Sequence, residues 1–103
     1  MNVEQQIRLV TGEGFASTRG VCELGIPPLK LSDGPHGVRA QHSKDADNLG
    51  KNKSMESTCF PTGAAMASSW DIDLIAEIAE AIGEEAKLFD IAVMFGPAIN
   101  IKR

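Results

Sequence analysis

A run of five apolar residues, 91–95, follows an 18-residue amphipathic pattern and ends at the dipeptide Gly96-Pro97. A continuous apolar run of this length is typical of a strand buried on both faces, as in parallel sheets covered by helices. A short strand is predicted at 29–31 (LKL), before the helical pattern, and the order strand, helix, strand predicts a parallel βα unit. A strand buried on both faces needs neighbours and covering helices that 103 residues hardly supply. We therefore expect an incomplete α/β domain.

The amphipathic pattern over residues 71–88 predicts a long helix. Asp71 is a suitable N-cap, because its carboxylate can accept hydrogen bonds from the free amides of the first turn. Trp70 and Ile75 are placed for a hydrophobic staple. Gly83 inside the pattern costs about 1 kcal/mol relative to Ala, so we expect another element to pack closely against it. The apolar residues recur at spacings of three and four: they are Ile72, Ile75, Ile78, Ala79, Ile82 and Ala86.

Shorter elements are predicted before this helix. Residues 3–10 carry an apolar stripe typical of a short amphipathic helix, and residues 11–14 (TGEG) end it. Residues 25–28 (GIPP) favour an extended approach, because each proline disfavours helix in the residue before it. The strand at 29–31 then ends in the turn-forming residues 32–35 (SDGP).

A polar stretch separates the first strand from the long helix. Residues 41–57 are almost entirely polar, which is typical of an exposed loop. Residues 58–63 return the chain to the core. The small residues of 64–69 suit close backbone packing, but their pattern does not indicate an element type.

The charge balance excludes several classes of partner. Ten Lys and Arg stand against 14 Asp and Glu, a net charge of -4, so nothing favours nucleic acid or anionic lipid. The glutamates of the long helix, Glu77, Glu80, Glu84 and Glu85, are better explained as a solvated face than as catalytic acids. No apolar run is long enough to cross a bilayer, and the polar start is unlike a signal peptide, so we expect a cytoplasmic protein. Cys22 and Cys59 fit reduced thiols.

Residues with metal-binding or phosphate-binding chemistry do not stand at the required spacing. His36, His42 and Cys59 contain no close pair of the kind that holds zinc. The glycines at 12, 14, 34 and 37 do not form a phosphate loop, because no lysine followed by serine or threonine stands at the required position. We therefore expect no metal and no cofactor.

Asp33 and Arg39 are the candidate site residues. Asp33 follows the first predicted strand, and the carboxyl ends of parallel strands are where α/β proteins and barrels place binding groups. Arg39 follows a turn that could fold it back toward Asp33. A carboxylate and a guanidinium together suit the recognition of sugar hydroxyls. Two simpler interpretations stay open: Asp33 only stabilises its turn, or the two residues form a structural ion pair.

Five segments, in this order, resemble the N-terminal part of family 3 glycoside hydrolases, the β-glucosidase and β-xylosidase group. They are residues 24–39 (LGIPPLKLSDGPHGVR), 59–61 (CFP), 67–71 (ASSWD), 83–86 (GEEA) and 96–103 (GPAINIKR). Each segment is short, but their shared order over residues 24–103 is hard to explain by chance. The resemblance implies that residues 1–103 are a partial N-terminal domain, the first third to half of a (β/α)8 TIM-like catalytic barrel of about 250 residues.

The resemblance also implies an activity. Family members are retaining enzymes that hydrolyse β-glucosides or β-xylosides with two carboxyl groups about 5 Å apart. In the family, the nucleophile is an aspartate of a later barrel strand, the acid/base comes from a following domain, and a lysine-histidine pair also binds the sugar. None of these has a counterpart in this chain, so we expect no catalytic residue here. Asp33 and, supporting it, Arg39 are implied to bind the sugar before the scissile bond; Arg103 stays outside the predicted site.

Two hypotheses follow. The first is a fragment of a retaining β-glycosidase that binds carbohydrate, needs the rest of the barrel and a following domain, and is inactive alone. The second is a complete, non-catalytic small α/β binding or interaction module, which would close its apolar edge by oligomerisation.

Overall fold

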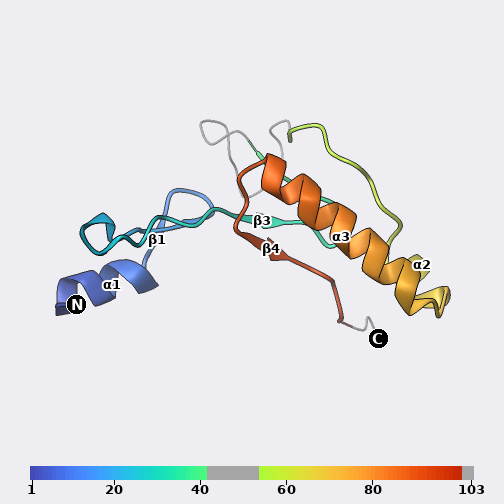
Figure 1. Ribbon diagram of the computed structural model, residues 1–103, viewed down its shortest axis with the longest axis horizontal. Coiled ribbons are helices and arrows are strands. Elements are labelled where there is room, and N and C mark those ends of the chain that lie inside the picture. Colours follow the sequence, from blue (N-terminus) through green and yellow to red (C-terminus); the bar gives the residue numbers. More distant parts are fainter. Residues whose placement is uncertain (42–53, 101–103) are drawn as a thin grey trace.

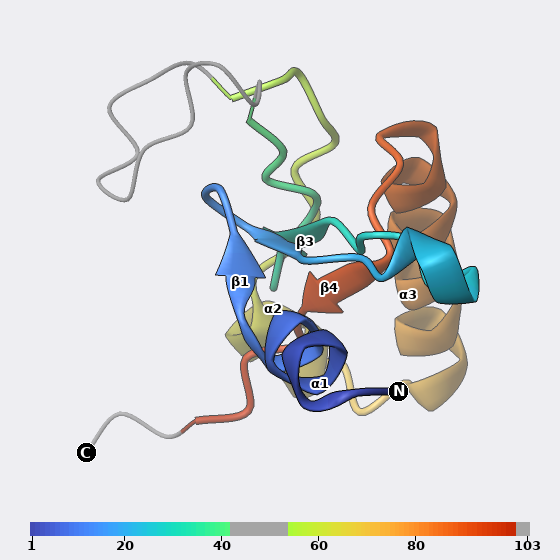
Figure 2. The same ribbon diagram turned by 90° about the vertical axis from the view of Figure 1, so that its left-hand side faces the viewer.

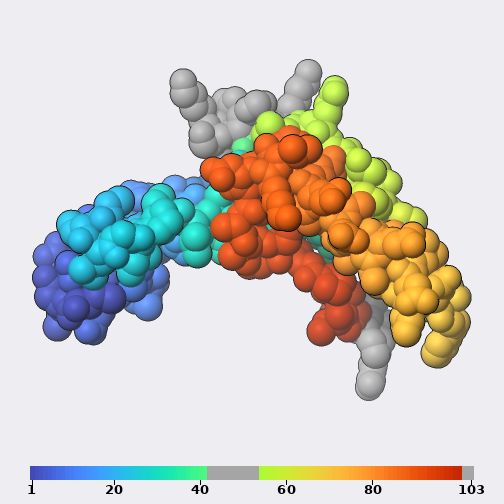
Figure 3. All heavy atoms as spheres, viewed as in Figure 1, coloured from blue at the N-terminus to red at the C-terminus, as the bar shows by residue number. Residues whose placement is uncertain are grey.

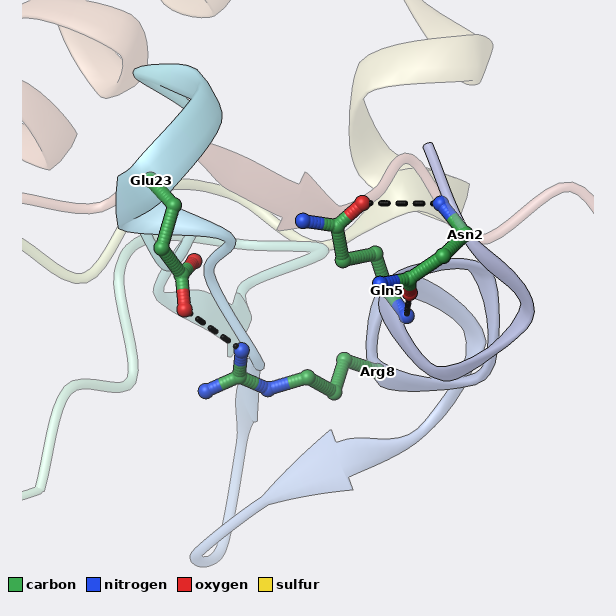
Figure 4. Close-up of polar contacts among 4 residues, drawn as sticks. All are labelled: Asn2, Gln5, Arg8 and Glu23. Atoms are coloured by element: carbon green, nitrogen blue, oxygen red, sulfur yellow. Dashed lines mark hydrogen bonds and ion pairs between the residues drawn. The ribbon is translucent and has the colours of Figure 1, made fainter.

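The computed structural model describes residues 1–41 and 54–100 (Figure 1). Its first element, α1 (Val3–Val10), confirms the predicted N-terminal helix. Asn2 caps this helix in a capping box: its side chain accepts a hydrogen bond from the Gln5 amide at 2.9 Å, and its own amide donates to the Gln5 side chain at 2.9 Å (Figure 4). The helix ends at Val10, and its C-cap, Thr11, is the first residue of the predicted stop signal.

A small antiparallel hairpin and a turn of 3₁₀ helix follow, and the sequence analysis predicted neither. The hairpin pairs β1 (Gly12–Glu13) with β2 (Ser17–Thr18), and η1 spans Cys22–Leu24. Arg8 of α1 reaches Glu23 of η1 in an ion pair of 3.0 Å (Figure 4). The backbone amide of Glu23 and, after it, the Arg8 guanidinium lower the pKa of the Glu23 carboxyl, and the same pair raises the pKa of Arg8.

The centre of the molecule is a parallel pair of strands, β3 (Leu31–Asp33) and β4 (Val93–Phe95), with α3 (Ile72–Leu88) between them in the chain (Figure 1). This confirms the predicted βα unit. Both strands begin two residues later than predicted. At the start of β3 the reason is a second partner: residues 29–31 pair first with the hairpin, through Thr18 N to Leu29 O and Leu31 N to Ala16 O, each at 2.9 Å.

Two helices lie between the strands in the chain. The small residues whose element type stayed open form α2 (Gly63–Ser68). Asp71 is the N-cap of α3 as predicted, and its carboxylate accepts from the Asp73 and Leu74 amides at 3.1 and 3.0 Å. The predicted staple is wrong: Trp70 is 91% exposed, and its φ of 54° turns the chain sharply before the helix.

The core lies where α3 meets the segment that follows β3 and the segment that leads into β4. It consists of Val38, Ala40, Ala86 and Ile91, with Met94 packed against them. Since side chains alternate along a strand, the neighbours of Met94 point to the other face, and Val93 and Phe95 are 37% and 53% exposed. The prediction that this strand is buried on both faces is therefore wrong for the described residues, because α3 covers one face only.

The molecule is open and arched, with extents of 49 × 32 × 29 Å (Figure 3). In the view turned by 90°, α1 and the hairpin project in front of the β3–β4 pair, with α3 beside that pair (Figure 2). The accessible surface is 7884 Å², whereas a compact monomer of this mass would expose about 5,600 Å². Most of the predicted exposed loop, at 42–53, lies outside the described residues. No described helix is both long and apolar enough to span a membrane.

Candidate functional site

Asp33 stands at the carboxyl end of β3, as predicted, beside the carboxyl end of β4. In the parallel register Asp33 pairs with Phe95, so the two strands end side by side. Ser32, just before it, is buried and donates its hydroxyl to the Arg39 carbonyl at 2.8 Å. The Ser32 side chain therefore ties the end of the strand to the far side of the turn that follows.

The turn after β3 returns Arg39 to Asp33. The Arg39 amide donates to the Asp33 carbonyl at 2.9 Å, and the two residues form an isolated antiparallel bridge. Gly37 makes the reversal feasible: its φ is +128°, and a Cβ there would collide with the Thr58 carbonyl oxygen. The sequence prediction that this turn folds Arg39 back toward Asp33 is confirmed.

The side chains of the two residues form a long, exposed ion pair. Arg39 Nη1 lies 3.8 Å from Asp33 Oδ2, and the side chains are 46% and 62% exposed. The ion-pair interpretation thus describes a contact that exists. An exposed pair of this kind contributes about 0–1 kcal/mol, so sugar hydroxyls could replace it at little cost in stability.

The two side chains border an open hollow at the carboxyl ends of the strands. Its volume is about 600 Å³, and Phe95 and the segment 96–98 after β4 form its other wall. Acceptors, donors and an aromatic ring therefore meet at one place. This combination can bind a polyol ring by hydrogen bonds to its hydroxyls and by apolar contact with its carbon face.

A second segment holds the turn from outside, and the sequence analysis missed it. The Ser57 hydroxyl donates to the Val38 carbonyl at 2.6 Å, and the Phe60 amide donates to the His36 carbonyl at 2.9 Å. His36 Nδ1 in turn accepts from the Gly63 amide, at the start of α2, at 3.2 Å. His36 thus has a structural partner in this turn.

Glu85 corrects one sequence interpretation. The sequence pattern predicts that it lies on the solvated face of the helix, but it is half-buried and its carboxylate accepts from the Thr58 amide at 2.9 Å. The signal was available: Glu85 falls three residues after Ile82, at the spacing of the apolar stripe, and so on its buried side. The other three glutamates of that group are exposed as expected.

The described residues contain no cluster of three or more His, Cys, Asp or Glu that could hold a metal ion. Both cysteines are free and exposed. His42, a potential metal ligand by residue type, and Arg103, which is not part of the predicted site, lie outside the part of the chain that the structure describes.

Comparisons with known proteins point in one direction. The model of the "Glycosyl hydrolase family 3 N terminal domain" matches residues 29–103. The chain is 41% identical over its full length to thermostable beta-glucosidase B of Acetivibrio thermocellus, covering 14% of that protein. It is 37% identical, again over its full length, to an exo-alpha-(1->6)-L-arabinopyranosidase of Bifidobacterium longum, also covering 14%. Beta-glucosidase 3B of Thermotoga neapolitana, solved with glucose, aligns with all of the chain and 16% of its own at a TM-score of 0.82 and 29% identity. The chain thus spans about one seventh of the length of these curated relatives.

Proposed function

The chain belongs to glycosyl hydrolase family 3, and from this premise we propose that it forms part of the sugar-binding subsite of a retaining β-glycosidase. Residues 1–103 would then be a partial catalytic domain, with β3, α3 and β4 among the first elements of a (β/α)8 barrel. The observation that carries the proposal is the meeting of Asp33 and Arg39 at the carboxyl ends of two parallel strands. Barrel enzymes build their active sites at that end.

The two residues have complementary roles in this proposal. The Asp33 carboxylate accepts hydrogen bonds from two adjacent hydroxyls of a β-glucoside or β-xyloside, and the Arg39 guanidinium donates to an oxygen of the same ring. The nucleophile and the acid/base are not in this chain. The rest of the barrel and a following domain would bring those two carboxyl groups to about 5 Å from each other. No cofactor is needed for this chemistry.

A chimera tests the proposal directly. This chain replaces the matching segment of the A. thermocellus β-glucosidase, and hydrolysis of aryl β-glucoside, β-xyloside and α-L-arabinopyranoside is measured. We expect the first or second substrate to be cleaved, and Asp33→Asn to lower kcat/KM by about 10- to 150-fold, as for a lost charged hydrogen bond. Glu77→Gln, at an exposed carboxylate of α3, is the control. Equal kcat/KM for Asp33→Asn and the unsubstituted chimera would refute the assignment.

The isolated chain should cleave nothing, because it lacks both catalytic carboxyl groups. Purified residues 1–103 are incubated with an aryl β-glucoside at high protein concentration. Cleavage that disappears with Asp33→Ala would contradict this expectation and would place catalytic chemistry at Asp33 itself.

One observation favours the alternative of a non-catalytic interaction module. Val3, Ile7 and Val10 of α1 are 70%, 58% and 86% exposed and lie on one helical stripe. An interaction module would bury this stripe by pairing with a second copy. Sedimentation of the isolated chain decides: a defined dimer supports the module, and a monomer or an undefined aggregate speaks against it. The cytoplasmic location remains a prediction from the sequence.

A further inference from the structure

Glu85 is placed unlike the other glutamates of α3. Its Oε1 accepts two hydrogen bonds, from the Thr58 amide at 2.9 Å and from the Thr58 hydroxyl at 3.2 Å. Its Oε2 is buried and has no hydrogen-bond partner among the described residues. Burying a carboxylate oxygen without a partner is unfavourable. A glutamate that served only as a polar residue on the exposed face of α3 would not be half-buried against Thr58. The contact therefore needs its own explanation.

The contact with Thr58 fixes the segment that holds the turn after β3. On one side of Thr58, the Ser57 hydroxyl binds the Val38 carbonyl at 2.6 Å. The carbonyl oxygen of Thr58 lies so close to Gly37 that no Cβ would fit there. These contacts link α3, through Glu85 and Thr58, to the turn that ends at Arg39.

We propose that Glu85 is a positioning residue for the sugar-binding pair: by holding Thr58 against Gly37, and with it Ser57 against Val38, it fixes the turn that places Arg39 beside Asp33. This inference rests on the proposed function for its catalytic consequence. A charged acceptor suits the role, because hydrogen bonds to a carboxylate are shorter and about twice as strong as neutral ones. Glu85 does not touch the sugar in this arrangement and takes no part in the chemistry.

The substitutions separate positioning from general stability. In the chimera described above, Glu85→Ala removes both hydrogen bonds and should lower kcat/KM about tenfold or more. Glu85→Gln keeps a neutral acceptor of the same length and should restore about half of the lost free energy, whereas Glu85→Asp is too short to reach Thr58. Glu84→Ala is the matched control, because Glu84 is the exposed neighbour on the same helix.

A double-mutant cycle gives the deciding readout. If Glu85 acts through Arg39, then Glu85→Ala should cost about tenfold in the unsubstituted chimera but less than about twofold in the Arg39→Ala background. Equal losses in both backgrounds would overturn the positioning role, even if Glu85→Ala also lowers the melting temperature.

Hydrogen exchange keeps this test apart from the proposed function. The Phe60 and Arg39 amides should exchange faster in Glu85→Ala than in Glu84→Ala, whether or not the chimera is active. The Arg39 amide closes the turn by donating to Asp33, and the Phe60 amide ties residues 57–63 to the turn by donating to His36. Unchanged exchange would overturn the inference alone. An inactive but folded chimera with faster exchange would refute the proposed function and, with it, the catalytic consequence, while Glu85 would remain the residue that holds the turn.

Discussion

The effect of Gly83→Ala on stability tests whether another element packs against α3 at this position. A Cβ at this position meets nothing within 4 Å among the described residues, which contradicts the sequence prediction that another element packs closely there. Ala in a helix interior is favoured over Gly by about 0.5–1 kcal/mol. In a domain of this size each 1 kcal/mol shifts the melting temperature by about 4–8 °C. We therefore expect Gly83→Ala to raise the melting temperature of the isolated chain by about 2–8 °C.

Thermal melts followed by far-ultraviolet circular dichroism measure this effect. Ala81→Gly is the matched control, because Ala81 is exposed on the same helix and the substitution runs in the opposite direction. It should lower the melting temperature by a similar amount. The reasoning is refuted if Gly83→Ala also lowers the melting temperature, since a neighbour would then already be packed against Gly83 in this chain.

The same substitution should have the opposite sign in the chimera. Gly83 borders an apolar hollow of about 220 Å³, whose wall includes Ile78, Ile82 and Met94. If the rest of the barrel fills that hollow, the added methyl group overpacks the contact and costs about 1–3 kcal/mol. Gly83→Ala would then destabilise the chimera while stabilising the isolated chain. Stabilisation in both proteins would show that no element approaches Gly83 closely.

Three further predictions concern single contacts. Gly37→Ala forces a non-glycine residue to a φ of +128° against the Thr58 carbonyl, which costs on the order of 1–3 kcal/mol; it should lower kcat/KM of the chimera, and unchanged kinetics would contradict it. Asp71→Ala removes the N-cap of α3 and should cost about 0.5–2 kcal/mol in urea unfolding. The pKa of Glu23 is lowered first by its own backbone amide and then by Arg8, so its stabilising contribution is present above its ordinary pKa and is lost as the pH falls through the lowered pKa. Arg8→Gln should raise the pKa of Glu23 in an NMR titration, and an unchanged value would rule out the ion pair.

The long helix was the most predictable part of the fold, because its evidence is local. The periodic apolar stripe and the Asp71 cap are properties of adjacent residues, and α3 agrees with the prediction to within one residue. The strand starts were less predictable. Leu29 satisfies its backbone groups through Thr18 of the hairpin, and the hairpin is only two residues long on each side, too short to leave an alternating pattern.

Only the part of the site formed by residues close in sequence could be predicted. Asp33 and Arg39 are six residues apart around a turn that glycine makes feasible, so their meeting follows from the sequence. The residues that hold this turn come from 57–63 and from α3, and nothing in the turn itself indicates them. The charge of Glu85 predicts an exposed side chain, whereas its place in the apolar stripe predicts a buried one. The hydrogen bond from the Thr58 amide lets the carboxylate stay charged in a half-buried position.

The exposure of the proposed site and the exposure of β4 have one cause. Among the described residues, β4 has no strand on its outer edge, and α3 covers only one face of the β3–β4 pair, so Phe95 is left 53% exposed beside the exposed side chain of Asp33. Barrel closure would give each strand a second neighbour and would surround the strand ends with loops. Exclusion of water would then strengthen every hydrogen bond from Asp33 and Arg39 to a sugar, because electrostatic interactions grow as the local dielectric falls. The same closure that would bury the apolar strand would therefore turn a weak surface ion pair into an effective sugar-binding pair.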